Sequence, residues 1–66
     1  MAELRNVYER DIYRLLIGYG RPLTTKKIAD KLGINWRTAK EHLIAMYRRK
    51  IVRYGRRGNR IYWAVL

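Results

Sequence analysis

The residues best suited to recognise a polar partner lie in the stretch 35–44, which reads NWRTAKEHLI. Arg37 carries a planar fork of N–H donors, Lys40 an ammonium group and Glu41 a carboxylate that accepts hydrogen bonds. Their spacing of three and four places them on one side of a helix. The same spacing allows an ion pair between Arg37 and Glu41, worth only roughly a few tenths of a kcal/mol. The ion pair and contact with a partner are compatible. These three side chains therefore remain the first candidates for binding.

Catalytic chemistry has few of its usual components in this chain. A nucleophile needs a neighbouring base and a metal site needs grouped ligands. The sequence contains no Ser or Cys, a single histidine at His42, and five scattered carboxylates. His42 has no obvious catalytic partner. We therefore expect no enzymatic activity, no metal site, no cofactor and no small-molecule ligand.

The charge of the chain is strongly positive and unevenly distributed. The formal net charge is +11, although the charges of residues 1–20 sum to zero. Thirteen Lys and Arg residues follow Gly20 and face only Asp30 and Glu41. Such a field favours a polyanionic partner, either nucleic acid or an anionic membrane surface. The alternative is an ordinary solvated surface.

Three amphipathic helices are predicted by the spacing of apolar residues. The first, over residues 3–18, has an apolar face made by Leu4, Val7, Tyr8, Ile12, Leu15, Leu16 and Tyr19. The second, over 25–32, has a narrow face made by Ile28, Ala29 and Leu32. The third, over 36–49, has a face made by Ala39, Leu43, Met46 and Tyr47. We expect these faces to form the core.

Local signals define the ends of these helices and a hairpin after them. Thr24 or Thr25 can cap the second helix, Gly33 can end it, and Asn35 can cap the third. The segments 51–57 and 60–66 are rich in β-branched and aromatic residues and are separated by Gly-Asn, which predicts a β-hairpin. Ile61, Trp63 and Val65 would share the face that closes the core.

Two helices joined by only three residues must cross at a large angle, so the second projects as a rod. In order, LTTKKIADKLGI, TAKEHL and KIVRYGRRGNRIYW resemble the supporting helix, recognition helix and wing of the winged helix-turn-helix family of bacterial and archaeal transcription regulators. The resemblance covers nearly the whole chain. It implies an α+β fold, a three-helix core with a C-terminal β-hairpin wing in a single domain over residues 1–66, and binding to double-stranded DNA.

The resemblance also implies roles for individual residues. The segment from Asn35 to Ile44 would carry the DNA-facing side of the recognition helix. Arg37 and Lys40 are the candidates for base contacts in the major groove, and Glu41 can accept from cytosine. The residues that match phosphate-contacting positions are Thr24, Thr25, Lys26 and Thr38. For Thr25, helix capping is an equally good explanation.

Two residues of this region have less certain roles. Trp36 departs from the family pattern, where a small or basic residue is usual. It could pack on sugars or thymine methyl groups, or lean on the supporting helix or the wing. His42 matches a position at the edge of the core, so we expect a half-buried imidazole.

The hairpin carries a second cationic cluster. Seven Lys or Arg residues and no acid occur from 48 to 60. The residues at its tip that could contact DNA are Arg56, Arg57, Asn59 and Arg60. This pattern suits a wing on the DNA backbone or in a minor groove, which attracts Arg where it is narrow. The alternative is a basic edge strand protected against aggregation.

Other partners and assemblies remain open at this point. A winged helix can also be a protein-docking module of a transcription or replication complex, or bind RNA or duplex shape without sequence preference. Tyr13 and Ile17 lie off the main stripe of the electroneutral first helix and could form a homodimer contact. The sequence has no apolar run long enough for a membrane span and no signal peptide. We therefore expect a complete intracellular protein, located in the cytoplasm with the nucleoid.

Overall fold

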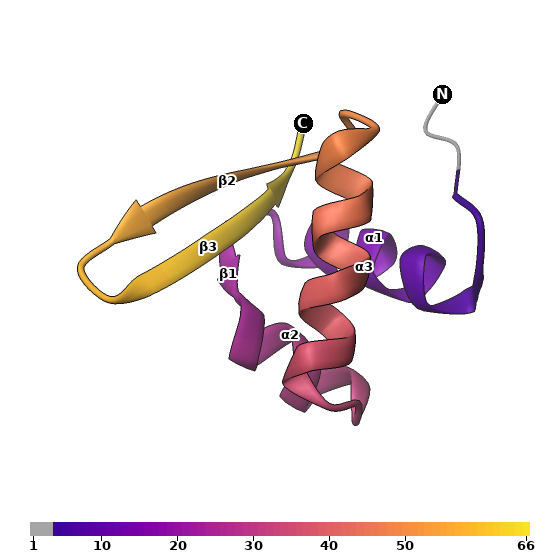
Figure 1. Ribbon diagram of the computed structural model, residues 1–66, viewed down its shortest axis with the longest axis horizontal. Coiled ribbons are helices and arrows are strands. Elements are labelled where there is room, and N and C mark those ends of the chain that lie inside the picture. The colour runs from indigo at the N-terminus through magenta and orange to yellow at the C-terminus, as the bar shows by residue number, and fades with distance from the viewer. Residues whose placement is uncertain (1–3) are drawn as a thin grey trace.

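The computed structural model describes residues 4–66 and contains three helices and a three-stranded antiparallel sheet (Figure 1). The elements follow in the order α1 (Val7–Tyr19), β1 (Leu23–Thr24), α2 (Thr25–Leu32), α3 (Trp36–Arg48), β2 (Val52–Arg57) and β3 (Arg60–Val65). The strand order in the sheet is β1-β3-β2. The expected α+β fold, a three-helix core followed by a C-terminal hairpin, is confirmed.

The start of α1 differs from the expectation. Asn6 is the N-cap, and its side-chain oxygen accepts from the Glu9 amide at 2.9 Å. In return, the Glu9 carboxylate accepts from the Arg5 amide at 2.8 Å, a variant of the capping box. The helix therefore begins at Val7, and residues 4–6 are not helical, whereas residue 3 lies outside the described part. Val7 and Tyr8 sit on the exposed first turn and do not belong to the core.

The short connection between α2 and α3 is built from the expected signals. The Thr24 hydroxyl caps α2 by accepting from the Lys27 amide at 3.1 Å. Gly33 ends α2 in the left-handed conformation with φ +67°, which residues with a Cβ adopt only with strain. The Asn35 side chain then accepts from the Arg37 amide at 2.8 Å and starts α3. The chain thus turns sharply and leaves α3 as a separate rod (Figure 1).

The end of α3 contains a feature that the sequence did not indicate. Lys50 has φ +61° and is the only non-glycine residue with a positive φ among residues 4–66. The amides of Lys50 and Ile51 donate to the carbonyls of Tyr47 and Met46, both at 2.9 Å. This is the hydrogen-bond pattern of a Schellman motif, in which glycine is the usual residue at the left-handed position.

We expect Lys50→Gly to stabilise the protein by about 1 kcal/mol, because a side chain in the left-handed region costs roughly 1–2 kcal/mol. For a domain of this size that corresponds to a rise in Tm of about 4–8 °C. Thermal unfolding followed by circular dichroism measures it. Lys50→Ala is the control, because it removes the same charge and keeps the strain. Equal melting temperatures for the two variants would contradict this explanation.

The core lies where the helices meet the inner face of the sheet. Its buried residues are Ile12, Leu16, Leu23, Ile28, Leu43, Met46, Ile51, Val52 and Trp63. Ile61 and Val65 pack against it on the same face of β3 as Trp63, as the alternation predicted. Tyr47 is a correction, because it lies 45% exposed at the end of α3 rather than in the core.

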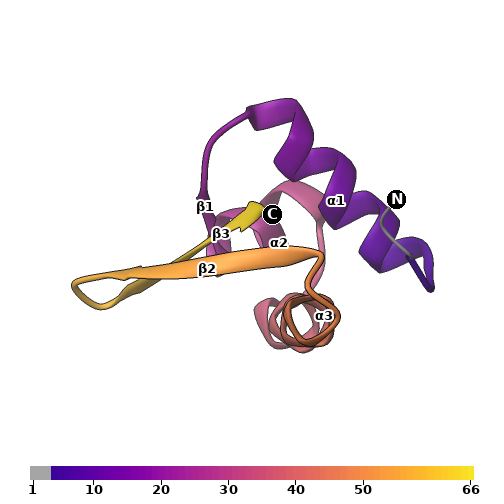
Figure 2. The same ribbon diagram turned by 90° about the horizontal axis from the view of Figure 1, so that it is seen from above.

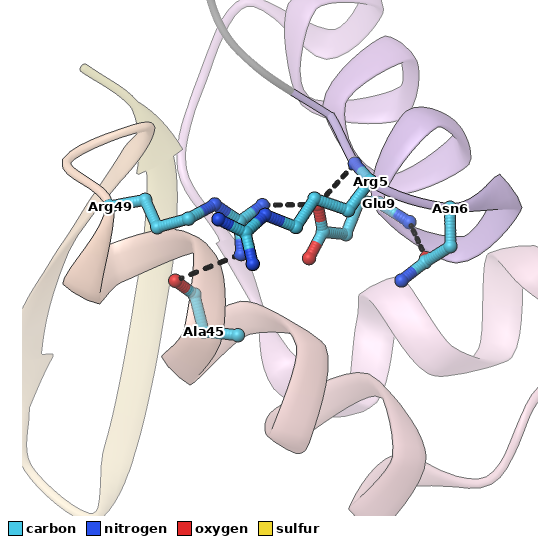
Figure 3. A network of polar contacts seen from close by, with 5 residues as sticks. All are labelled: Arg5, Asn6, Glu9, Ala45 and Arg49. Atoms are coloured by element: carbon cyan, nitrogen blue, oxygen red, sulfur yellow. Dashed lines mark hydrogen bonds and ion pairs between the residues drawn. The ribbon is translucent and has the colours of Figure 1, made fainter.

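A buried ion pair joins the first turn of α1 to the end of α3 (Figure 3). The Glu9 side chain on α1 is almost completely buried and pairs with Arg49, the C-cap of α3. Burial raises the pKa of the Glu9 carboxyl, but the hydrogen bonds from Arg49 and the Arg5 amide, with the charges of Arg49 and His42, outweigh it and hold the pKa below its ordinary value. Glu9 is therefore a structural carboxylate.

The hairpin projects away from the helices, and α3 lies to one side of it (Figure 2). Its register pairs Tyr54 with Trp63 and Arg57 with Arg60. Gly58 at the tip has φ +58°, and Asn59 does not have a positive φ. This pattern is that of a two-residue type II′ turn, which requires glycine at its first position.

Among residues 4–66, no helix is long and apolar enough to cross a membrane.

Candidate nucleic-acid interface

An open groove lies between α2, the first turn of α3 and the tip of the hairpin, and we call it the recognition groove. It brings together side chains from three elements that are separated in the sequence. Those that can contact an anion or a polar edge are Thr24, Thr25, Lys26, Lys27, Asn35, Lys40, Asn59 and Arg60. Trp36 and Ile61 add apolar surface. The groove is therefore cationic with an apolar strip, which suits the phosphates and sugars of a nucleic acid.

Trp36 organises the two cations that the sequence selected for base contacts. Its side chain is 50% exposed and lines the recognition groove. The Arg37 guanidinium carbon lies 5.5 Å and the Lys40 Nζ 6.0 Å from the centroid of its ring. Both are within the range of cation–π attraction, worth about 0.5–1 kcal/mol at exposed sites. Trp36 thus restrains two long side chains on the exposed first turns of α3.

The threonines at the start of α2 already have structural partners. The Thr24 hydroxyl accepts from the Lys27 amide, and the Thr25 hydroxyl accepts from the indole N–H of Trp63 at 2.8 Å. The second contact ties α2 to β3. Thr24 and not Thr25 caps α2, so the capping explanation for Thr25 is wrong. The Thr25 hydroxyl bonds to Trp63 instead and can still donate its own proton.

The remaining sequence-selected residues divide by exposure. Those exposed to solvent are Lys26, Asn35, Trp36, Arg37, Lys40, Glu41, Arg56, Arg57, Asn59 and Arg60. Thr38 is half-buried. Ile44 is half-buried and packs against the hydrophobic core. The possible ion pair between Arg37 and Glu41 is not formed, since the ion pairs of residues 4–66 are Arg10 with Asp11 and Arg49 with Glu9.

The two faces of the hairpin carry different cations, because side chains alternate along a strand. Tyr54 contacts Tyr47 of α3 edge-on, with ring centroids 5.0 Å apart, so its face is the one toward α3. Arg56 shares that face, and its Nε donates to the Gly58 carbonyl at 3.4 Å. Arg57 points to the opposite face. The tip of the hairpin is consequently cationic on both sides.

Some residues of the site were not selected from the sequence. Lys27 lines the recognition groove beside Lys26, although its amide is used to cap α2. Its position one residue after Lys26, on the same exposed turn, was the available signal. His42 is half-buried, as expected, and stacks on Tyr8 with ring centroids 4.8 Å apart. Among residues 4–66, no three His, Asp or Glu side chains are grouped in a way that could hold a metal ion.

Comparison with known proteins identifies the fold. No family model matches the chain, and no curated protein matches its sequence significantly. Its backbone matches the crystal structure of AntR, an antimony-specific transcriptional repressor, with a TM-score of 0.86, covering 96% of this chain and 56% of AntR at 24% identity. This chain is a winged helix. The winged helix also matches a mutant of ZitR from Lactococcus lactis, with a TM-score of 0.70 over 97% of this chain and 47% of ZitR at 17% identity.

The winged helix spans about half the length of the two solved chains that it matches. AntR is a transcriptional repressor. At these identities the match concerns the fold, so roles of individual residues rest on the geometry of the groove.

Proposed function

We propose that this winged helix binds double-stranded DNA in a sequence-specific manner and acts as an intracellular transcription regulator. The observation that carries the proposal is the recognition groove, where the start of α2, the start of α3 and the hairpin tip present cations on one concave surface. A helix of this size fits the major groove of B-DNA. The resemblance to AntR, which is a transcriptional repressor, supports the same class of function.

In this proposal each element has a separate task. Arg37, Lys40 and Glu41 on α3 meet base edges, where Arg binds guanine through two hydrogen bonds. Lys26 and Lys27, at the start of α2, meet phosphates, which the N-terminus of a helix also favours. The hairpin tip lies along the backbone or enters the adjacent minor groove. Trp36 holds the two reading cations and can also pack against sugars.

A second candidate function is DNA binding without sequence preference. The observation that favours it is the distribution of cations over both faces of the hairpin, since phosphate contacts alone carry no sequence information. Selection of bound duplexes from a random-sequence pool, followed by footprinting, distinguishes the two. A recovered motif covering one major-groove site supports sequence reading. A pool that stays random after repeated rounds at physiological salt contradicts it.

We also propose dimerisation through α1, and the exposure of its side chains selects one contact residue. Ile17 is 55% exposed, whereas Tyr13 packs partly against the core. We expect Ile17→Glu to give a folded monomer that binds a palindromic site more weakly, because a charge in an apolar contact opposes association. Sedimentation measures the assembly, and Arg14→Glu, an exposed change on the same helix, is the control. A wild-type protein that is monomeric both free and on DNA would rule out this contact.

A further inference from the structure

A second groove lies on the face of the sheet that points away from α3, and we call it the outer groove. It is more cationic than the recognition groove. The charged residues that line it are Arg21, Lys27, Arg53, Arg57 and Arg60, together with Arg56 from the α3-facing side of β2. No Asp or Glu is among its lining residues, whereas Asp30 lines the recognition groove. The outer groove therefore has more cations than the recognition groove and no acid, and it shares Thr24, Lys27 and Arg60 with it.

The outer groove follows from the alternation of side chains along the hairpin. Arg53, Gly55 and Arg57 are at alternate positions of β2 and share the face opposite Tyr54. Gly55 pairs with Tyr62, and Arg53 with Ala64, so small or flat residues form the floor between the arginines. The result is a channel in which the Cα atoms of two arginines, Arg53 and Arg57, are spaced about 13 Å apart along one strand.

Gly55 has no role inside the protein that would require glycine. It lies in the middle of β2, the register continues through it without a bulge, and its φ is not positive. A Cβ placed on it would meet no atom within 4 Å. Glycine inside a strand weakens the strand, and it often marks a place where a ligand or another backbone approaches closely. The open space above Gly55 is inside the outer groove.

The pairing of Arg57 with Arg60 supports the same conclusion as Gly55. These residues are directly opposite in the antiparallel register, where like charges destabilise a sheet. No acidic residue lines the groove beside them. Two features therefore destabilise the hairpin in the same region, a glycine inside a strand and two arginines that face each other. An anionic chain lying across Gly55 between the arginines removes the electrostatic cost and uses the open space.

We propose that the outer groove holds the sugar–phosphate backbone of a second segment of double-stranded DNA, so that one protein molecule bridges two segments. Guanidinium groups bind phosphate oxygens through two parallel hydrogen bonds. An acidic protein partner is less suitable, because the groove is open, whereas protein interfaces bury their aromatic anchors in enclosed pockets. We infer a second segment because Arg53, Gly55 and Arg57 are on the face of β2 opposite the one that contacts α3, although Lys27 and Arg60 line both grooves. The proposal rests on the proposed function only in that the partner is DNA.

The test measures binding of one duplex and capture of a second. An unlabelled duplex is fixed to beads, the full chain is bound to it, and a fluorescent duplex of different sequence is added. Gly55→Val keeps every charge and suits a strand, and its side chain fills the space above the floor. We expect it to reduce capture of the second duplex about tenfold, equivalent to ~1.4 kcal/mol. We expect its affinity for the first duplex to stay within about twofold, a change of under ~0.5 kcal/mol.

A charge variant keeps the proposal testable if the valine disturbs the strand. Arg53→Gln should reduce capture, whereas Arg48→Gln, which removes a cation outside both grooves, should not. Equal capture by Gly55→Val or Arg53→Gln and wild-type protein overturns the proposal. Equal loss of first and second binding also overturns it, because the groove then belongs to a single interface. Capture abolished by Ile17→Glu alone assigns bridging to a dimer, and displacement of the second duplex by polyglutamate at matched charge assigns the groove to acidic proteins.

If the groove binds DNA as proposed while selection recovers no motif, the second site stands and sequence-specific regulation fails. If selection recovers a motif and capture is absent, the reverse holds. The two experiments therefore fail independently.

Discussion

Glu9→Gln lowers the free energy of unfolding by about 3 kcal/mol, the lower end of the ~3–5 kcal/mol that follows when one partner of a buried ion pair is removed. The lower end applies because the Arg49 side chain is 21% exposed and water partly compensates its charge. For a domain of this length the loss corresponds to a fall in Tm of about 12 °C or more. This is the largest effect of a single substitution on stability that we predict. It is severe because small domains have limited stability.

The control is Asp11→Asn, which removes a carboxylate from an exposed pair with Arg10. We expect that change to stay within about 0.5 kcal/mol of wild type. Thermal and urea unfolding of the two variants measure the difference. If both variants lost the same stability, the burial of Glu9 would not be the cause.

The same ion pair sets an acid limit on stability. The pKa of Glu9 is held below its ordinary value in the folded protein, so its stabilising contribution is complete above the unfolded pKa of about 4.3. It is lost as the pH falls through the lower folded pKa. The free energy of unfolding of the wild-type protein should therefore decrease as the pH is lowered from about 4.3. In the Glu9→Gln variant this decrease should be smaller. An identical slope in wild type and variant would contradict the assignment.

Arg37→Ala should cost about 1–3 kcal/mol on the selected site and relax the preference at one base pair. The reason is that Arg37 stands on the exposed first turn of α3, restrained by Trp36. Lys26→Ala should weaken all duplexes similarly and reduce the salt slope by about one, because a phosphate contact carries no sequence information. Salt-dependent titrations on the selected and a scrambled duplex measure both.

Arg14→Ala is the matched control for these variants. It removes one exposed cation from α1, outside both grooves, and should change neither affinity nor preference appreciably. Both test variants should remain folded, because neither side chain belongs to the core. If Arg37→Ala weakened binding to both duplexes equally, Arg37 would not contact a base edge, and Lys40 or Glu41 would become the candidate for that contact.

The elements with strong local signals could be predicted from the sequence. Thr24, Gly33 and Asn35 act within a few residues of themselves, as a cap, a left-handed stop and a second cap. Their roles were therefore readable without knowing the fold. The start of α1 was missed because the apolar spacing suggested a longer helix. The Asn-x-x-Glu pattern at Asn6 was the signal that would have corrected it.

The features that depend on distant residues could not be predicted in the same way. Glu9 and Arg49 are 40 residues apart, and no periodicity indicates that one charged residue of α1 turns inward. The hydrogen bond between Thr25 and Trp63 likewise depends on how β3 meets α2. The division of the hairpin cations between two faces was implicit in strand alternation, but only the register shows that Arg57 faces Arg60.

The measurement that tests the central claim most directly is the affinity of the full chain for duplex DNA as a function of salt. If the recognition groove neutralises phosphates with its cations, log K falls linearly with log salt, at roughly −0.9 per phosphate. We expect a slope steeper than about −3, because at least four cations reach the groove, and weaker binding to a polyglutamate of equal charge. A flat salt response, or equal affinity for the polypeptide, would contradict DNA binding by this surface.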